Sequence, residues 1–295
     1  MIDRSQLLSD LQALLKKLEA DLAERSDLEE VSEVREALQV EYAKAQEAER
    51  TALSYEKWRS GYATQVVVAW VLSVVFARFL EDNGLVELPR LSGPADRLQR
   101  ARDEHEVYFR AHPTETDREY LLYVFRELGQ LPGMGASFLD HNPIFELPNW
   151  LSGDATGTLL RFFQQIEPET GELVHDFTDP DWDTRFLGDL YQDLSETARK
   201  RYALLQTPIF VENFILDRTL DPAIEEFGLQ DFRMIDPACG SGHFLLGSFE
   251  RILERWQKKE PGTNVRALAQ RALYSVHGVD VNPYAIAIAR FRLLL

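Results

Sequence analysis

The first 180 residues carry apolar side chains at the three- and four-residue spacing of amphipathic helices. In the first predicted helix, leucines repeat on one face: Leu7, Leu11, Leu14, Leu18 and Leu22. Ser26 and Glu29 have the spacing of a capping box and predict the start of a second helix. Residues 62–82 are apolar on nearly every side, which predicts a central helix that ends at Asn83 and Gly84.

Two further helices are expected in this front part, over 117–128 and 159–166, with a turn-rich stretch at 129–152 between them. The most apolar window, 66–77, is shorter than a bilayer requires, so we expect a buried helix and no contact with a membrane. The amino-terminus lacks a basic start followed by an apolar stretch, so no signal peptide is expected.

The pattern changes near residue 186, where short apolar runs of strand length begin to alternate with helices. The expected elements are a polar helix from about 188 to 205, a helix at 209–220 with Pro208 in its first turn, a strand at 232–235, a helix to about 258, another at 265–272, a strand at 274–279 and a helix at 284–295. This order is a β-α-β unit with one additional helix. The predicted fold class is therefore α + α/β, a helical amino-terminal domain followed by an incomplete parallel sheet.

Charge is distributed unevenly along the chain. The formal net charge of −17 opposes binding to a nucleic acid. Residues 231–295 hold nine Lys/Arg and six Asp/Glu, a net of +3, so the first 230 residues hold −20. The front part is therefore not expected to grip DNA. The chain has one cysteine, which excludes a disulfide framework and fits a cytoplasmic protein.

A glycine-rich turn follows the first predicted strand and carries the candidate chemistry. Asp236 follows the strand, and Gly240 and Gly242 let the backbone approach a ligand closely before a helix begins. A dinucleotide-binding turn would need a third glycine at the position of Leu245, and the Asp236 carboxylate would repel a pyrophosphate. S-adenosylmethionine, which has an ammonium and a sulfonium group and no phosphate, suits this turn better.

Asp280 ends the second predicted strand, where its carboxylate can accept the hydrogens of both ribose hydroxyls of a cofactor. It follows Asp236 by 44 residues, more than the roughly 20 of the compact dinucleotide fingerprint, and the additional helix accounts for the excess. Cys239 is expected to be a small buried packing residue, and His243 is expected to face solvent at the start of a helix. Neither indicates a nucleophile or a metal site.

Three segments resemble the motifs of one family. DPACGSG at 236–242, followed by Phe244 and Leu245, resembles motif I of amino-methyltransferases that act on DNA adenine. GVDVNPYA at 278–285 resembles their motif II, and Thr207-Pro208 is similar to motif X. FLEDNGL at 79–85 and LGDLY at 187–191 look like the amino-terminal region of large phage-defence methyltransferases of the phage-growth-limitation or BREX type.

The resemblance implies a Rossmann-like methyltransferase fold of which this chain holds the start. It implies that S-adenosylmethionine is bound by Asp236, Gly240, Gly242 and Asp280, with Thr207 near its methionine part, and it implies no metal. The domains would be a helical domain at 1–185, a connector with the motif X-like helix at 186–230, and the first β-α-β part of the methyltransferase domain at 231–295. The intact enzyme would methylate adenine N6 in double-stranded DNA, in phage defence or restriction-modification, with other defence proteins as possible partners.

The family's catalytic Asn-Pro-Pro-Tyr motif does not follow motif II in this sequence. The nearest match, Asn142-Pro143-Ile144-Phe145, lacks the second proline and lies in a turn-rich stretch, so we expect an ordinary loop there. No catalytic residue is therefore assigned, and we expect the chain to be a fragment that is inactive alone. Two alternatives stay open: a methyltransferase of another substrate, such as a glutamine side chain, and a non-catalytic interaction module of a defence complex.

Overall fold

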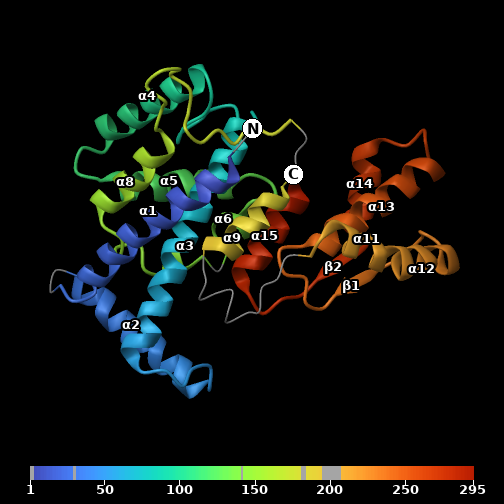
Figure 1. Ribbon diagram of the computed structural model, residues 1–295, viewed down its shortest axis with the longest axis horizontal. Helices are drawn as coiled ribbons and strands as arrows, with labels where there is room; N and C mark the ends of the chain where they lie inside the picture. The colour runs from blue at the N-terminus through green and yellow to red at the C-terminus, as the bar shows by residue number, and fades with distance from the viewer. Residues whose placement is uncertain (1–2, 29–30, 141, 181–183, 195–206) are drawn as a thin grey trace. The chain divides into compact units, whose positions relative to one another are not determined.

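The structure is a computed structural model of the 295-residue chain, which describes all residues except 1–2, 29–30, 141, 181–183 and 195–206. The chain divides into two compact units. The first consists of Met1–Asp183 with Asp193–Thr197, and the second of Thr184–Gln192 with Ala198–Leu295. Figure 1 labels the helices and strands along the chain.

The described part of the first unit is helical, apart from loops and one isolated antiparallel bridge, Ile166 to Leu173. Its helices are α1 (Arg4–Arg25), α2 (Ser32–Glu47), α3 (Tyr55–Asp82), α4 (Asp96–Ala111), α5 (Asp117–Gly129), α6 (Gly135–Phe138), α7 (Pro143–Glu146) and α8 (Gly153–Phe163). Helix α3 is central, because α1, α2, α5 and α7 all pack against it. The five leucines of the α1 stripe are all buried, as their spacing predicts.

Helix α3 begins seven residues before the predicted start at residue 62, at Tyr55. It is long and apolar enough to cross a membrane by length and composition, but 89% of its most apolar window is buried inside the protein. The predicted buried helix at 66–77 is therefore confirmed. The predicted stop is also confirmed, since Asn83 is the C-cap and Gly84 has the left-handed φ of 68° that suits a glycine.

In the first unit one expectation is wrong and one helix was not expected. Ser26 does not start a helix: it follows α1, and its hydroxyl donates to the Leu22 carbonyl at 2.6 Å and accepts from the Trp150 indole at 2.9 Å. Its predicted partner, Glu29, lies outside the described residues, and α2 begins at Ser32. Helix α4 was not predicted, because half of its residues are charged and only Ala101 is buried.

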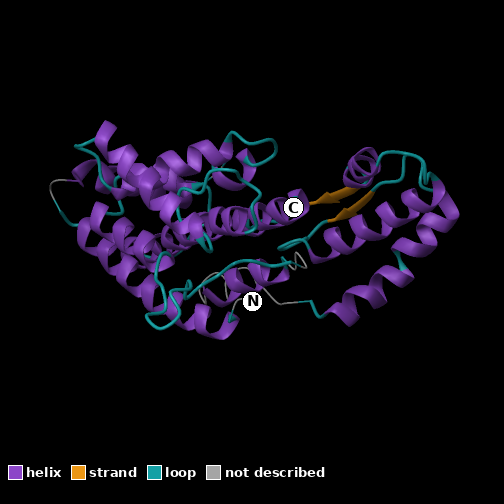
Figure 2. Cartoon of the chain, turned by 90° about the horizontal axis from the view of Figure 1, so that it is seen from above, coloured by secondary structure: helices purple, strands orange, loops and turns teal. Residues whose placement is uncertain are grey.

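The second unit contains a small parallel sheet among helices. Its elements are α9 (Arg185–Leu194), α11 (Ile209–Arg218), α12 (Leu220–Phe227), β1 (Met234–Asp236), α13 (His243–Lys259), α14 (Val265–Leu273), β2 (Val276–Gly278) and α15 (Pro283–Leu294). Strands β1 and β2 pair in parallel, with Met234 opposite Val276 and Asp236 opposite Gly278. Figure 2 shows the two strands side by side in orange. The predicted β-α-β order with an additional helix is thus present.

The core of this unit lies between the helices and the sheet. Its buried members include Leu216, Ile224, Leu245, Ile252, Trp256 and Leu268. The helix expected at 209–220 is present as α11, two residues shorter at its end. Thr219, with a non-helical φ of −123°, separates it from α12, which was not predicted. The predicted polar helix begins with α9, and its continuation toward residue 205 lies outside the described residues after Leu194. Both strands are shorter than their apolar runs.

Candidate functional site

The two acidic residues singled out in the sequence lie at the same end of the sheet. Asp236 is the last residue of β1, and Asp280 follows β2 by two residues. Because the strands are parallel, their carboxyl ends meet at one edge, the usual place for a ligand in an α/β unit. Backbone hydrogen bonds continue the pairing beyond the strands: Val279 N–H donates to the Asp236 carbonyl at 2.9 Å, and Cys239 N–H donates to the Val279 carbonyl at 3.0 Å.

The Asp280 carboxylate joins the two loops that follow the strands. Its Oδ2 accepts from the backbone N–H of Gly240 at 2.9 Å, and its Oδ1 accepts from the backbone N–H of Asn282 at 2.8 Å. Each carboxylate oxygen has two acceptor positions, so both can still receive a hydrogen from a ligand. The structure therefore brings Asp280 and Gly240 into direct contact, although they are 40 residues apart in the sequence.

Asp236 has one satisfied and one unsatisfied oxygen. Its Oδ1 accepts from the backbone N–H of Ala238 at 3.0 Å. Its Oδ2 is buried and has no hydrogen-bond partner. A buried acceptor without a partner is costly, and such atoms are expected where a ligand or ion completes the structure.

The two glycines of the turn have different surroundings. Gly240 has a φ of +52°, and a Cβ built there would meet no atom within 4 Å, so its open side can admit a ligand close to the backbone. Gly242 has a φ of +86°, and a Cβ there would lie 2.9 Å from the Cβ of Ala289 on α15. Gly242 therefore allows α15 to pack closely against the start of α13.

Cys239 is a buried packing residue, as expected. Its side chain packs against Gly278 of β2: a Cβ built on Gly278 would lie 2.9 Å from the Cys239 sulfur. Burial, together with the nearby carboxylates of Asp236 and Asp280, raises the pKa of the Cys239 thiol to about 11. A thiol with that pKa is a poor nucleophile at neutral pH, which agrees with a structural role.

The expectation for His243 is wrong. This first residue of α13 is 7% exposed, and its Nδ1 lies 3.2 Å from the Arg185 guanidinium of α9. Arg185 also pairs with Glu212 of α11, which is itself buried. The sequence around His243 shows only a helix start, so the covering side chains, which come from two distant segments, could not be anticipated.

Thr207 lies directly before Pro208, the N-cap of α11, and is half-buried. Among the described residues it makes no hydrogen bond to Asp236, Gly240, Gly242 or Asp280. Its role beside a cofactor stays a prediction.

The Asn142-Pro143-Ile144-Phe145 segment is structural. Asn142 is the N-cap of α7, and its Oδ1 accepts from the backbone N–H of Ile144 at 3.2 Å. Its Nδ2 donates to the Phe138 carbonyl at 2.9 Å and to Ser73 Oγ at 3.2 Å. The Asn142 amide is thus occupied in capping the short helix α7, where the sequence predicts a loop.

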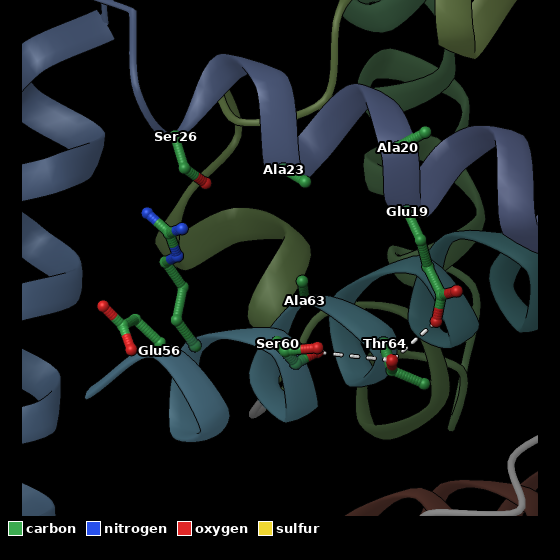
Figure 3. Close-up of a pocket in the computed structure, with 9 residues that line it drawn as sticks. Glu19, Ala20, Ala23, Ser26, Glu56, Ser60, Ala63 and Thr64 are labelled. Carbon is green, nitrogen blue, oxygen red and sulfur yellow. Dashed lines mark hydrogen bonds between the residues drawn. The ribbon is translucent and has the colours of Figure 1, made fainter. Parts of the chain in front are cut away.

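Two hollows lie away from the acidic loops. One, of about 300 Å³, lies between α1 and α3 in the first unit and is lined mainly by small side chains. Figure 3 shows Glu19 of α1 reaching toward Thr64 of α3, whose hydroxyl donates to it. The other, of about 400 Å³, lies before β1 in the second unit and includes Arg233, Trp256 and Tyr274. Neither contains a residue of the predicted site.

Comparison with curated proteins supports the resemblance to adenine-specific methyltransferases that the motifs indicate. Over its whole length the chain is 49% identical to the adenine-specific methyltransferase PglX of Streptomyces coelicolor. Over 75% of its length it is 22% identical to a putative type II restriction enzyme and methyltransferase of Methanocaldococcus jannaschii. The chain is thus related to methyltransferases.

The chain spans about a quarter of the length of these relatives, 25% of the first and 24% of the second. No protein-family model matches it. No solved structure matches it either.

Proposed function

We propose that this chain provides the cofactor-binding part of an S-adenosylmethionine-dependent DNA methyltransferase that acts on adenine N6. The observation that carries the proposal is the pair of carboxylates at the ends of β1 and β2. Asp280 links the two loops through the Gly240 and Asn282 amides, and Asp236 keeps a buried oxygen without a partner. The methyltransferase relatives support the same conclusion.

The residues present fit S-adenosylmethionine. The unpartnered Oδ2 of Asp236 can accept from a cationic ammonium group, and the open side of Gly240 leaves room for a ligand against the backbone. Asp280 has acceptor capacity left for the ribose hydroxyls. When bound, the cofactor supplies the methyl group. The task of these residues would be to bind and orient it in a Rossmann-like unit.

The transfer itself would need parts of the enzyme beyond this chain. By analogy with enzymes that act on a base, a flipped adenine would present its exocyclic amine in line with the methyl group, and protein acceptors would take the amine's hydrogens. We infer that double-stranded DNA is the substrate, that the setting is phage defence or restriction-modification in the cytoplasm, and that this chain alone does not catalyse the reaction.

The proposal is tested by calorimetric titration of S-adenosylmethionine into the chain and into Asp236→Ala. Binding that is lost in Asp236→Ala, with circular dichroism unchanged, is the expected result. Asp231→Asn is a matched control: Asp231 has a φ of +59°, which asparagine also tolerates, and it lies outside the site. The proposal is wrong if Asp236→Ala binds as tightly as the unaltered chain.

The alternatives need the intact enzyme. Adenine methylation of genomic DNA in a strain with the full-length gene, lost on Asp236→Ala, would support the DNA substrate. Methylation of a protein glutamine instead, or no methylation at all, would favour the other substrate class or the non-catalytic module.

A further inference from the structure

Helix α9 packs against both loops of the proposed cofactor site. On the β1 side, a Cβ built on Gly188 of α9 would lie 2.5 Å from the Oγ of Ser241. The helix can therefore lie this close to the glycine turn because Gly188 has no side chain. On the β2 side, Tyr191 reaches Asn282. Figure 1 shows α9, in yellow, beside α15, in red.

Tyr191 and Asn282 form a buried pair. The Tyr191 hydroxyl accepts from Asn282 Nδ2 at 3.0 Å and lies 3.2 Å from Asn282 Oδ1, to which it can donate. Asn282 is 0% exposed and Tyr191 is 2% exposed, so water cannot replace either partner. The Tyr191 ring also packs on the Tyr284 ring, with centroids 5.8 Å apart.

Asn282 in turn fixes the position of Asp280. The side-chain oxygen of Asn282 accepts from the backbone N–H of Tyr284 at 3.1 Å, which caps α15. The backbone N–H of Asn282 donates to Asp280 Oδ1 at 2.8 Å. The side chain of Asn282 thus fixes the start of α15, and the backbone N–H of the same residue holds one oxygen of the Asp280 carboxylate.

We propose that Tyr191 is a positioning residue for the cofactor's ribose, which acts through Asn282 on the Asp280 carboxylate. This rests on the proposed function, because it takes Asp280 to be the ribose-binding group. Without the Tyr191 hydroxyl, the buried Asn282 amide loses a partner and Asp280 is no longer held in one orientation. In the unaltered chain, the Tyr191 hydroxyl would therefore increase the preference of the site for a ribose over a dideoxyribose.

The test uses the full chain, Tyr191→Phe and two ligands, S-adenosylhomocysteine and its 2′,3′-dideoxy analogue. Phenylalanine keeps the ring contact with Tyr284 and removes only the hydroxyl. We expect Tyr191→Phe to weaken S-adenosylhomocysteine about 10-fold, the cost of an unpaired buried polar group, and to weaken the dideoxy analogue by less than about 2-fold. Tyr274→Phe, at an exposed tyrosine in the same unit, should change neither.

The outcomes separate the two proposals. If the unaltered chain does not bind S-adenosylmethionine or S-adenosylhomocysteine, both proposals are wrong. If it binds and Tyr191→Phe weakens both ligands equally, or neither, the cofactor site stands and the role of Tyr191 is refuted. If Tyr191→Phe does not fold, Asn282→Ser tests the same bond from the other side, because serine still caps α15 but is too short to reach Tyr191. The same selective loss is then expected.

Discussion

Cys239 shows how neighbouring groups decide what a side chain can do. It lies in the glycine turn near two carboxylates. From the sequence alone, a cysteine at such a position could be interpreted as a catalytic residue. Burial and these carboxylates raise its pKa to about 11, so almost no thiolate exists at neutral pH. The environment suppresses the reactivity that the residue type alone would allow.

We therefore predict that the folded chain reacts slowly with thiol reagents. At pH 8, labelling of Cys239 by a disulfide reagent should be on the order of 100-fold slower than labelling of the urea-unfolded chain, because thiolate is scarce and the sulfur is buried. The chain has one cysteine, so the signal belongs to this site alone. Equal rates in the folded and unfolded chain would contradict the raised pKa.

Glu81 is the second residue whose burial has a measurable consequence. Its carboxylate is 1% exposed and accepts from the backbone N–H groups of Arg90, Leu91 and Ser92 at 2.7–3.1 Å. Burial is the largest influence and raises its pKa to about 7, while these three amides and nearby Arg78 oppose the rise. The carboxylate thus fastens the loop after α3 and carries a proton in part of the population at neutral pH.

The sign of the resulting pH dependence is fixed. Because the folded pKa is above the unfolded value of 4.5, the contribution of Glu81 to stability is complete below pH 4.5 and is lost as the pH rises through about 7. Between pH 6 and pH 8 the loss should be about 1 kcal/mol. Glu81→Gln cannot titrate, so its free energy of unfolding should change less over this interval. The prediction fails if both proteins lose stability equally in urea titrations at the two pH values.

Single residues differ in how far the sequence predicts them. Asp236 and Asp280 could be placed because each directly follows a predicted strand, and parallel strands bring such positions to one edge. The burial of His243 and the contact between Tyr191 and Asn282 could not, because α9 lies far from both loops in the sequence. The LGDLY segment signalled a family likeness without indicating which contacts its residues make.

At the scale of elements, a buried ion pair fastens the segment after α8 to α3. Arg78 and Asp82 are both fully buried, one turn apart on α3, and their side chains pair at 2.7 Å. The Arg78 guanidinium also donates to the carbonyls of Phe163 and His175, and Asp82 accepts from the backbone N–H of Phe177. The central helix therefore provides both its apolar surface and the hydrogen-bond partners of an irregular segment.

We predict that Arg78→Met destabilises the first unit strongly. Methionine fills a similar volume but leaves Asp82 buried without its cation, and breaking such a pair costs about 3–5 kcal/mol. Arg100→Met is the matched control, because Arg100 pairs with Asp96 one turn away on α4 and both side chains are more than half exposed. It should cost less than about 1 kcal/mol in the same urea titration. Similar losses of unfolding free energy in the two variants would show that the buried pair contributes no more to stability than the exposed pair.

The elements best predicted are those with a pronounced apolar pattern. The leucine stripe of α1 and the all-round apolar surface of α3 identify helices with little ambiguity, because burial of those faces stabilises them. Helix α4 was not predicted because it buries only Ala101, and α12 was not predicted because it follows α11 after a single residue, Thr219. The short strands were recognised because turn residues lie on either side of them, but both were predicted to be longer than they are, and β1 ends one residue further along the chain than its predicted end.

At the scale of the whole molecule, charge opposes binding to DNA by this chain alone. The formal net charge is −17, and 43 of the 49 Asp and Glu residues precede residue 231. The basic side chains of residues 231–295 are less available to bind DNA than their number suggests. Arg251 and Arg255 pair with Asp221, Arg271 pairs with Glu260, and Arg292 is 4% exposed.

We therefore predict that the chain binds a DNA duplex more weakly than about 10 μM even near 50 mM salt, where phosphate contacts are strongest. Fluorescence anisotropy of a labelled duplex measures this, and full-length PglX of Streptomyces coelicolor is the comparison, since the chain matches a quarter of it. If the remaining three quarters hold the DNA-binding surface, the long protein should bind with an affinity that falls steeply as salt is added. Tight, salt-dependent binding by the short chain would instead place a DNA-binding surface on this chain. Its assignment to cofactor binding alone would then be too narrow.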